Sequence, residues 1–194
     1  MSTKPLLDYI KKYIALTLEE ETLLLSKTSL RTYLKNQYIV QQGDVCNSAN
    51  FIINGCTKTF YMDTEGQEHI VMFSVEDWWA SDLGSFITQT PADFNVQCIE
   101  NTQLIQFNYD KLEELYIEIP KLERLFRKIV ERAFVASQNR IIRNFSLDAK
   151  ERYAIFKHTY PKIDRRVPQY MIASYLGITK EFLSKIKSQL IHEQ

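Results

Sequence analysis

The sequence has few of the residues that build metal, covalent or disulfide-rich sites. It contains three cysteines, three histidines and five glycines among 194 residues. Cys46, Cys56 and Cys98 are odd in number and far apart, which argues against a disulfide framework and predicts free thiols. No stretch approaches the roughly 20 apolar residues that a membrane span needs. We therefore expect a cytoplasmic protein with no metal site and no membrane partner.

Equal numbers of basic and acidic residues hide an uneven distribution of charge along the chain. Residues 150–194 carry nine Lys or Arg against four Asp or Glu, whereas residues 1–149 carry fifteen against twenty. A basic segment of this kind favours contact with nucleic-acid phosphates, and such binding weakens as salt rises. The charge distribution therefore points to the carboxyl-terminal end as the place where a nucleic acid would bind.

Residues 169–190 have the pattern of a helix-turn-helix. Apolar residues share one face of each of two predicted helices: Ile172, Ala173 and Leu176 on the first, Leu183 and Ile186 on the second. Gly177 can adopt the positive φ that ends the first helix sharply. Thr179 stands where its hydroxyl can cap the second helix. We therefore predict two crossed helices with a common buried face.

The polar residues of this segment predict a surface that reads double-stranded DNA. The predicted contacts are Gln169, Thr179, Lys180, Glu181, Ser184, Lys185 and Ser188. In the major groove a lysine can donate to guanine, a glutamate can accept from cytosine, and a serine can do either. The alternative is an ordinary helical hairpin whose basic face is simply solvated.

Short runs of β-branched and aromatic residues predict a β-rich region before residue 108. The runs are residues 38–40, 51–53, 57–62, 69–73, 95–99 and 103–107. Turn residues separate them, and Asn54-Gly55 predicts a tight type I′ hairpin. The spacing suggests a small sandwich, roll or barrel. Before this region, Thr17 and Glu20 have capping-box spacing, which predicts a helix from about Leu18 to Ser26.

Helical periodicity takes over after residue 108. We expect Asp110 to cap a helix that ends near Ile117, Pro120 to open a long helix to about Asn144, and Asp148 to cap a further helix to Tyr160. The apolar stripe of the long helix predicts a two-fold dimer. The expected interface residues are Leu122, Phe126, Ile129, Val130, Ala133 and Ser137. The alternative is a stripe buried wholly within its own chain.

This order of parts resembles the transcription regulators of the CRP/FNR superfamily, the relatives of the cyclic-AMP receptor protein and the fumarate-nitrate regulator. The most specific matches, residues 148–153, Val167-Pro168 and residues 172–179, closely resemble short family members from Bacteroidetes-type bacteria. The resemblance implies an α+β fold with an amino-terminal jelly roll (double-stranded β-helix) of the cyclic-nucleotide-binding type. It also implies a homodimer, a near-palindromic operator, contact with RNA polymerase and an effector held in the roll.

The resemblance also marks where an effector would bind. Family members that bind cyclic AMP carry Gly-Glu-Leu on a short helix and, farther along, an Arg-Ser pair. Here Asp82 could replace the ribose-binding glutamate, but Ala92 and Asp93 stand at the arginine position. A carboxylate where a phosphate would lie repels it, so we expect no cyclic AMP. The candidate pocket residues are Trp78, Trp79, Asp82, Leu83, Phe86 and Asp93, although the aromatic ones are also typical of a core.

Two other classes of protein compete with the regulator. A cupin-type metalloenzyme would share the short strands, but it needs converging histidines, and two of the three histidines, His158 and His192, fall in the helical end. We therefore expect no enzymatic activity. A roll that acts as an adaptor without reading DNA is the second alternative. The predicted division is a sensor roll over residues 1–118, a dimerisation helix over 119–146 and a DNA-binding domain over 147–194.

Overall fold

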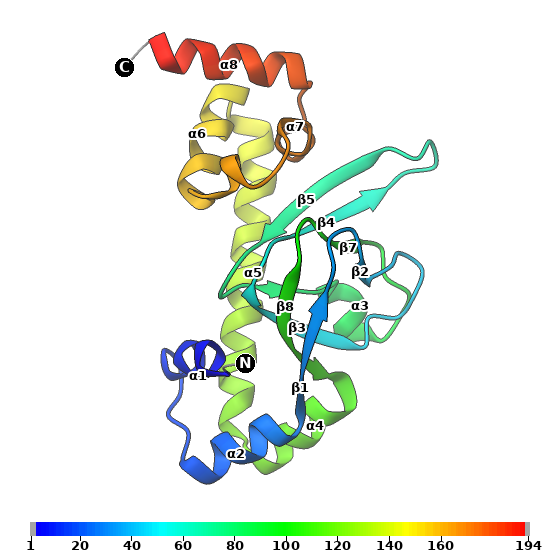
Figure 1. Cartoon of the computed structure of the whole chain (residues 1–194), viewed down its shortest axis with the longest axis vertical. Coiled ribbons are helices and arrows are strands. Elements are labelled where there is room, and N and C mark those ends of the chain that lie inside the picture. Colours follow the sequence, from blue (N-terminus) through cyan, green and yellow to red (C-terminus); the bar gives the residue numbers. More distant parts are fainter. Residues whose placement is uncertain (1–2, 193–194) are drawn as a thin grey trace.

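The structure is a computed structural model that describes residues 3–192, with side chains described up to residue 190. A β-roll lies beside one long helix, and shorter helices gather at both ends of that helix (Figure 1). The helices are α1 (Lys4–Lys11), α2 (Leu18–Ser26), α3 (Leu83–Thr88), α4 (Tyr109–Glu118), α5 (Lys121–Ser146), α6 (Ala149–Thr159), η1 (Ile163–Arg165, a 3-10 turn), α7 (Gln169–Leu176) and α8 (Lys180–His192). Within the described range, no helix is both long and apolar enough to cross a membrane.

Two antiparallel four-stranded sheets form the roll. The first sheet has the order β1-β8-β3-β6 and the second has the order β2-β7-β4-β5. The strands are β1 (Thr28–Tyr33), β2 (Tyr38–Val40), β3 (Ser48–Asn54), β4 (Thr57–Met62), β5 (Glu68–Ser74), β6 (Trp79–Ala80), β7 (Asn95–Cys98) and β8 (Thr102–Asn108). The predicted α+β class is confirmed by the two sheets, the long helix and the carboxyl-terminal helices. The β4–β5 hairpin projects well beyond the rest of the roll (Figure 1).

The Asn54-Gly55 pair does not form the predicted hairpin. Strands β3 and β4 on its two sides belong to different sheets, so the chain turns a corner there instead of folding back. Gly55 has φ 119°, whereas Asn54 does not have the positive φ that a type I′ turn requires. A Cβ on Gly55 would come within 2.5 Å of Thr102 Oγ1. The glycine is therefore required by close approach of two backbones at the corner between the sheets.

Side-chain hydrogen bonds cap the starts of several helices, and the caps at Thr17, Asp148 and Thr179 were predicted from the sequence. Thr17 with Glu20 and Asp148 with Glu151 form complete capping boxes at the starts of α2 and α6. One predicted cap is wrong. Helix α4 is capped by Asn108, whose side chain accepts from the amide of Lys111, and Asp110 lies within its first turn. The charge of Asp110 still suits that end of the helix dipole.

Two hydrophobic cores organise the molecule. The first joins the roll to α1, α4 and the beginning of α5, where Leu122 and Leu125 are fully buried. The second joins Phe60, Ile70 and Phe73 of the β4–β5 hairpin to helices α6, α7 and α8. The carboxyl-terminal helices therefore share a core with the roll, and we call α6 through α8 with η1 the reading unit.

Candidate nucleic-acid interface

The helices α7 and α8 cross with a buried face between them. Leu183 and Ile186 of α8 are 0% and 2% exposed and pack in the same core as α7. Gly177 ends α7 with φ 66°, and the hydroxyl of Thr179 accepts a hydrogen bond from the amide of Phe182 at 3.2 Å. Arg152 of α6 donates to the carbonyl of Leu176 at 3.2 Å. These contacts fix the turn between α7 and α8 and so set the direction of α8.

The polar residues on the opposite side line one shallow hollow of about 590 Å³. Its lining residues are Gln169, Lys180, Glu181, Ser184, Lys185, Ser188 and Gln189. The structure thus brings together six of the seven residues predicted to contact DNA, and Thr179 is exposed at the head of the same helix. Gln189 was not predicted, although it follows Lys185 by one helical turn and so shares its face. Contact of this surface with DNA stays a prediction.

Several basic residues of the reading unit have internal partners and are not available to a ligand. Arg152 donates to the carbonyls of Leu147 and Leu176, and Lys187 pairs with Asp164 at 2.7 Å. Arg166 pairs with two glutamates of the roll. By contrast, Lys180 and Lys185 are exposed at the hollow. Only part of the basic charge counted from the sequence is therefore available at the surface. At the hollow, Lys180 and Lys185 provide the basic charge.

The long helix α5 divides into a buried and an exposed half. Leu122 is fully buried in the chain's own core, and Phe126 and Ile129 pack against that core. This part of the predicted dimer face is already occupied by the chain itself, because the roll and α1 cover it. Val130 is half-buried, and Ala133 and Ser137 are exposed. Farther along, large apolar side chains are exposed: Phe134, Val135, Ile141, Ile142 and Phe145. The exposed apolar part of α5 therefore lies nearer its carboxyl-terminal end, and a dimer along this helix stays a prediction.

The carboxylate of Asp82 lies in a cradle of backbone amides in the roll. Asp82 is 4% exposed, and its Oδ1 accepts from the amide of Ser85 at 3.0 Å. Its Oδ2 accepts from the amides of Asp93 and Phe94, both at 3.0 Å. Backbone amides converging in this way are a typical anion cradle. Asp82 therefore caps α3 and ties down the following loop through the chain's own amides.

The other predicted pocket residues do not surround one cavity. The ring of Trp79 lies 5.4 Å from Phe51 and 5.3 Å from Phe126, in the core between the roll and α5. Trp78 packs instead on Tyr160 of the reading unit, at 5.3 Å. Phe86 is buried, Leu83 is half-buried and Asp93 is exposed. The aromatic residues are core residues, which was the alternative left open by the sequence.

These residues do not fit the ligands expected from related folds. A cyclic nucleotide needs a cation for its phosphate, but the cradle offers none, and Asp82 already takes its amides. An iron-sulfur cluster needs four cysteine ligands. Cys46, Cys56 and Cys98 are all buried, and burial raises the pKa of the Cys56 thiol to about 12. Among the described residues, no three His, Cys, Asp or Glu side chains gather as a metal site.

Contacts between the roll and the reading unit could not be found from the sequence. Ser174 of α7 donates to the carbonyl of Glu68 at 2.8 Å and accepts from the amide of Ile70 at 3.2 Å. Arg140 of α5 donates to the carbonyls of Ile70 and Tyr175 at 3.0 and 3.3 Å. All of these partners are distant in sequence, and no local pattern marks them.

Comparisons with known proteins agree with this architecture. The family model of the cyclic nucleotide-binding domain matches residues 30–118. The anaerobic regulatory protein of Haemophilus influenzae is 26% identical over 165 residues, covering 78% of this chain and 63% of that protein. The transcriptional activator Anr of Pseudomonas protegens is 25% identical over 167 residues, covering 80% of this chain and 68% of the relative. The chain thus spans less than two thirds of the first of these relatives.

A solved structure shows the same fold. The c-di-GMP-responsive global regulator CLP of Xanthomonas campestris superimposes with a TM-score of 0.71 at 16% identity, covering 91% of this chain and 93% of CLP. A cyclic nucleotide-binding type of roll, a long helix and a terminal helix pair together define the class of regulator to which these relatives belong. In sequence and architecture this chain is similar to these regulators, which are of the CRP/FNR type.

Proposed function

We propose that the chain is a DNA-binding transcription regulator that reads its operator with α7 and α8. The observation that carries this proposal is the hollow in which Gln169, Lys180, Glu181, Ser184, Lys185 and Ser188 are exposed together. Leu183 and Ile186 lie behind it and hold α8 by its apolar side. A basic residue and hydrogen-bonding side chains at the start of an exposed helix are what major-groove recognition requires.

The active form is proposed to be a homodimer joined along the exposed half of α5. Val130, Phe134, Ser137 and Ile141 follow each other at spacings of four, three and four residues, which places them on one face of the helix. An exposed apolar face of this length normally marks an interaction site. Two-fold symmetry of the protein would match a near-palindromic operator, with one half-site for each reading unit.

The proposal assigns a role to each part of the chain. Residues 1–118 form the roll, 119–146 the dimerisation helix and 147–194 the DNA-binding part, in the cytoplasm and with RNA polymerase as a further partner. The regulators named above are relatives of this kind and not enzymes. Because the cradle is filled by Asp82, the proposed regulator takes no cyclic nucleotide.

Selection of bound duplexes from a random DNA pool tests the proposal. The protein should enrich a near-palindromic sequence, and its affinity for that duplex should fall steeply between low and moderate salt. An adaptor that works through its roll would enrich no sequence. A duplex bound with no salt dependence would also contradict the assigned role of the two lysines.

A further inference from the structure

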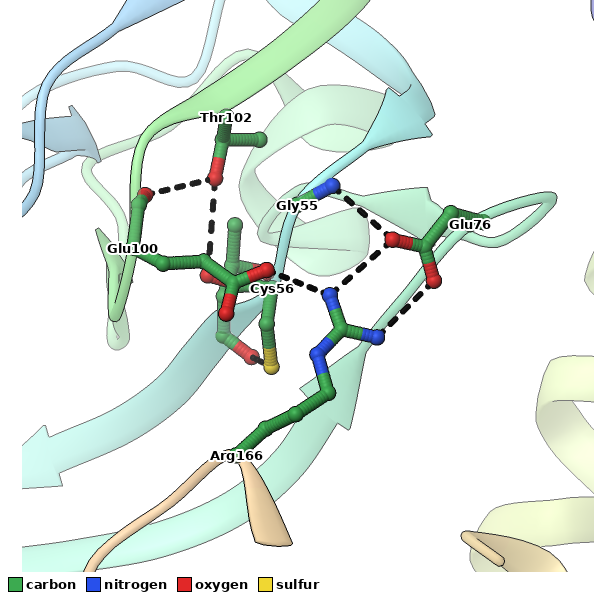
Figure 2. A network of polar contacts seen from close by, with 7 residues as sticks. Gly55, Cys56, Glu76, Glu100, Thr102 and Arg166 are labelled. Carbon is green, nitrogen blue, oxygen red and sulfur yellow. Dashed lines mark hydrogen bonds and ion pairs between the residues drawn. The ribbon is translucent and has the colours of Figure 1, made fainter. Parts of the chain in front are cut away.

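Arg166 connects the reading unit to the roll through a fork of hydrogen bonds. It lies between η1 and α7, and its two terminal nitrogens donate to the two carboxylate oxygens of Glu76, each at 2.9 Å. One of these nitrogens also donates to Glu100. Figure 2 shows the guanidinium held between the two carboxylates, which come from separate segments of the roll. We call Arg166, Glu76 and Glu100 the clamp.

The roll holds Glu76 by its carboxylate and Glu100 by its backbone carbonyl. The amide of Gly55 donates to Glu76 at 3.0 Å, and Thr102 donates to the carbonyl of Glu100 at 2.9 Å (Figure 2). Hydrogen bonds to Glu76 and Glu100 raise the pKa of Arg166. Burial alone would raise the pKa of Glu76, but the bonds from Arg166 and Gly55 lower it. The forked hydrogen bonds of Arg166 therefore fix the geometry of the clamp.

Two further contacts join the same two bodies. Ser174 bridges the backbone of Glu68 and Ile70, and Trp78 stacks on Tyr160. None of these residues lines the hollow on α7 and α8. One side of the reading unit thus packs against the roll, while its polar face at the hollow stays exposed.

We propose that Arg166, Glu76 and Glu100 are positioning residues for DNA binding, because the clamp holds the reading unit in the orientation in which it meets the operator. This inference rests on the proposed function. In a dimer, the distance between the two hollows depends on how each reading unit sits on its own roll. Half-sites lie about 34 Å apart along the duplex, so a reading unit fixed in advance loses less entropy on binding.

The docking can be followed without DNA. The chain has two tryptophans, so replacing Trp79 by Phe leaves Trp78 as the only one. Trp78 should then report contact with Tyr160, and its emission should shift to longer wavelength when the reading unit separates from the roll. In this background we expect the double variant Glu76→Gln, Glu100→Gln to show that shift, while its far-ultraviolet circular dichroism stays unchanged. Glu65→Gln, an exposed acid on the β4–β5 turn, is the matched control.

The effect on DNA binding has a sign that distinguishes the clamp from simple electrostatics. Removing two acidic charges from a DNA-binding protein should strengthen its attraction to phosphates. The clamp predicts the opposite, a loss of about tenfold in affinity for the selected duplex, because each charged hydrogen bond contributes to the fixed orientation. Arg166→Lys should fall between the wild type and Arg166→Gln, since lysine keeps the charge but not the fork. Glu65→Gln should bind as the wild type does or slightly better.

Each result has a definite meaning. No shift of Trp78 emission in the double variant overturns the clamp, since docking would then survive without it. A shift with unchanged or stronger DNA binding overturns the positioning role, because the docked orientation would not be the binding one. If the wild type selects no duplex, the proposed function fails and the positioning role with it. Trp78 emission would still show in that case that the docking itself depends on the clamp.

Discussion

The roll and the reading unit differ in whether the chain itself occupies their candidate binding surfaces. In the roll, amides arranged to hold an anion are occupied by Asp82, and the space against α5 is filled by Trp79 and Phe126. At the other end of the molecule, Lys180 and Lys185 stand exposed in an open hollow. The exposed half of α5 likewise leaves Phe134 and Phe145 open, at 62% and 88% exposure. The chain itself therefore occupies the amide cradle of the roll, whereas the hollow on α8 and the outer half of α5 are open.

This difference teaches that converging backbone amides do not by themselves make an open anion site. The loop after α3 is held by the carboxylate of Asp82, which accepts hydrogen bonds from the amides of Ser85, Asp93 and Phe94. Exposed apolar faces of this size favour association, so we expect a partner to cover the open face of α5 when the protein functions. The comparison therefore predicts where substitutions reduce binding and where they reduce stability.

The largest expected effect comes from the open face of α5. Phe134→Asp combined with Ile141→Asp should yield monomers in sedimentation, because the pair places charges in the proposed dimer seam. Loss of the second reading unit should lower operator affinity by about a thousandfold. Asn139→Asp, an exposed position away from that face, is the control and should remain dimeric. A dimeric Phe134→Asp, Ile141→Asp variant would place the seam elsewhere.

The next effect concerns the open hollow. Lys180→Ala with Lys185→Ala should weaken operator binding by about a hundredfold, since base-edge contacts are worth about 1–3 kcal/mol each. The thermal midpoint and the dimer mass should not change, because both side chains are exposed. Operator affinity can be measured by gel shift. In that measurement Lys162→Ala, which removes an exposed basic residue outside the hollow, should have a much smaller effect. Equal affinities for the double variant and the wild type would contradict the assigned role.

The smallest effect tests the closed cradle. Asp82→Ala leaves the amides of Ser85, Asp93 and Phe94 without their acceptor, which should cost about 2 kcal/mol in the free energy of unfolding. Inorganic phosphate should partly restore the melting temperature of this variant and leave that of the wild type unchanged. Asp93→Ala, which removes an exposed carboxylate of the same loop, should be nearly neutral. Stabilisation of the wild type by phosphate would show that the cradle is not closed.

Local chemistry in the sequence predicted many of the elements and most of the candidate surface. The capping boxes at Thr17 and Asp148, the turn at Gly177 and the lysines of α8 each depend on residues within one or two turns. Strand β1 was missed because Thr28–Tyr33 is an edge strand with four exposed residues in a row and no alternating pattern. Helix α1 (Lys4–Lys11) was not predicted either; it has only eight residues and no side-chain cap.

The features that could not be predicted depend on contacts between residues far apart in the sequence. The hairpin predicted at Asn54-Gly55 failed because a corner between two sheets has the same turn residues as a hairpin. Leu122, Phe126 and Ile129, expected on the dimer face, pack in or against the chain's own core, since an apolar stripe does not say which part its own roll covers. Arg166 also could not be linked to Glu76, because 90 residues separate them.

The bridge made by Ser174 also bears on how the molecule behaves in a crowded solution. Strand β5 is the last strand of its sheet, and its outer backbone groups at Glu68 and Ile70 are occupied by Ser174 and Arg140. Uncovered strand edges readily pair with the edges of other molecules and start aggregation. A helix of the reading unit thus seals this edge. Variants that release that helix should therefore be recognised first by their lower solubility on storage.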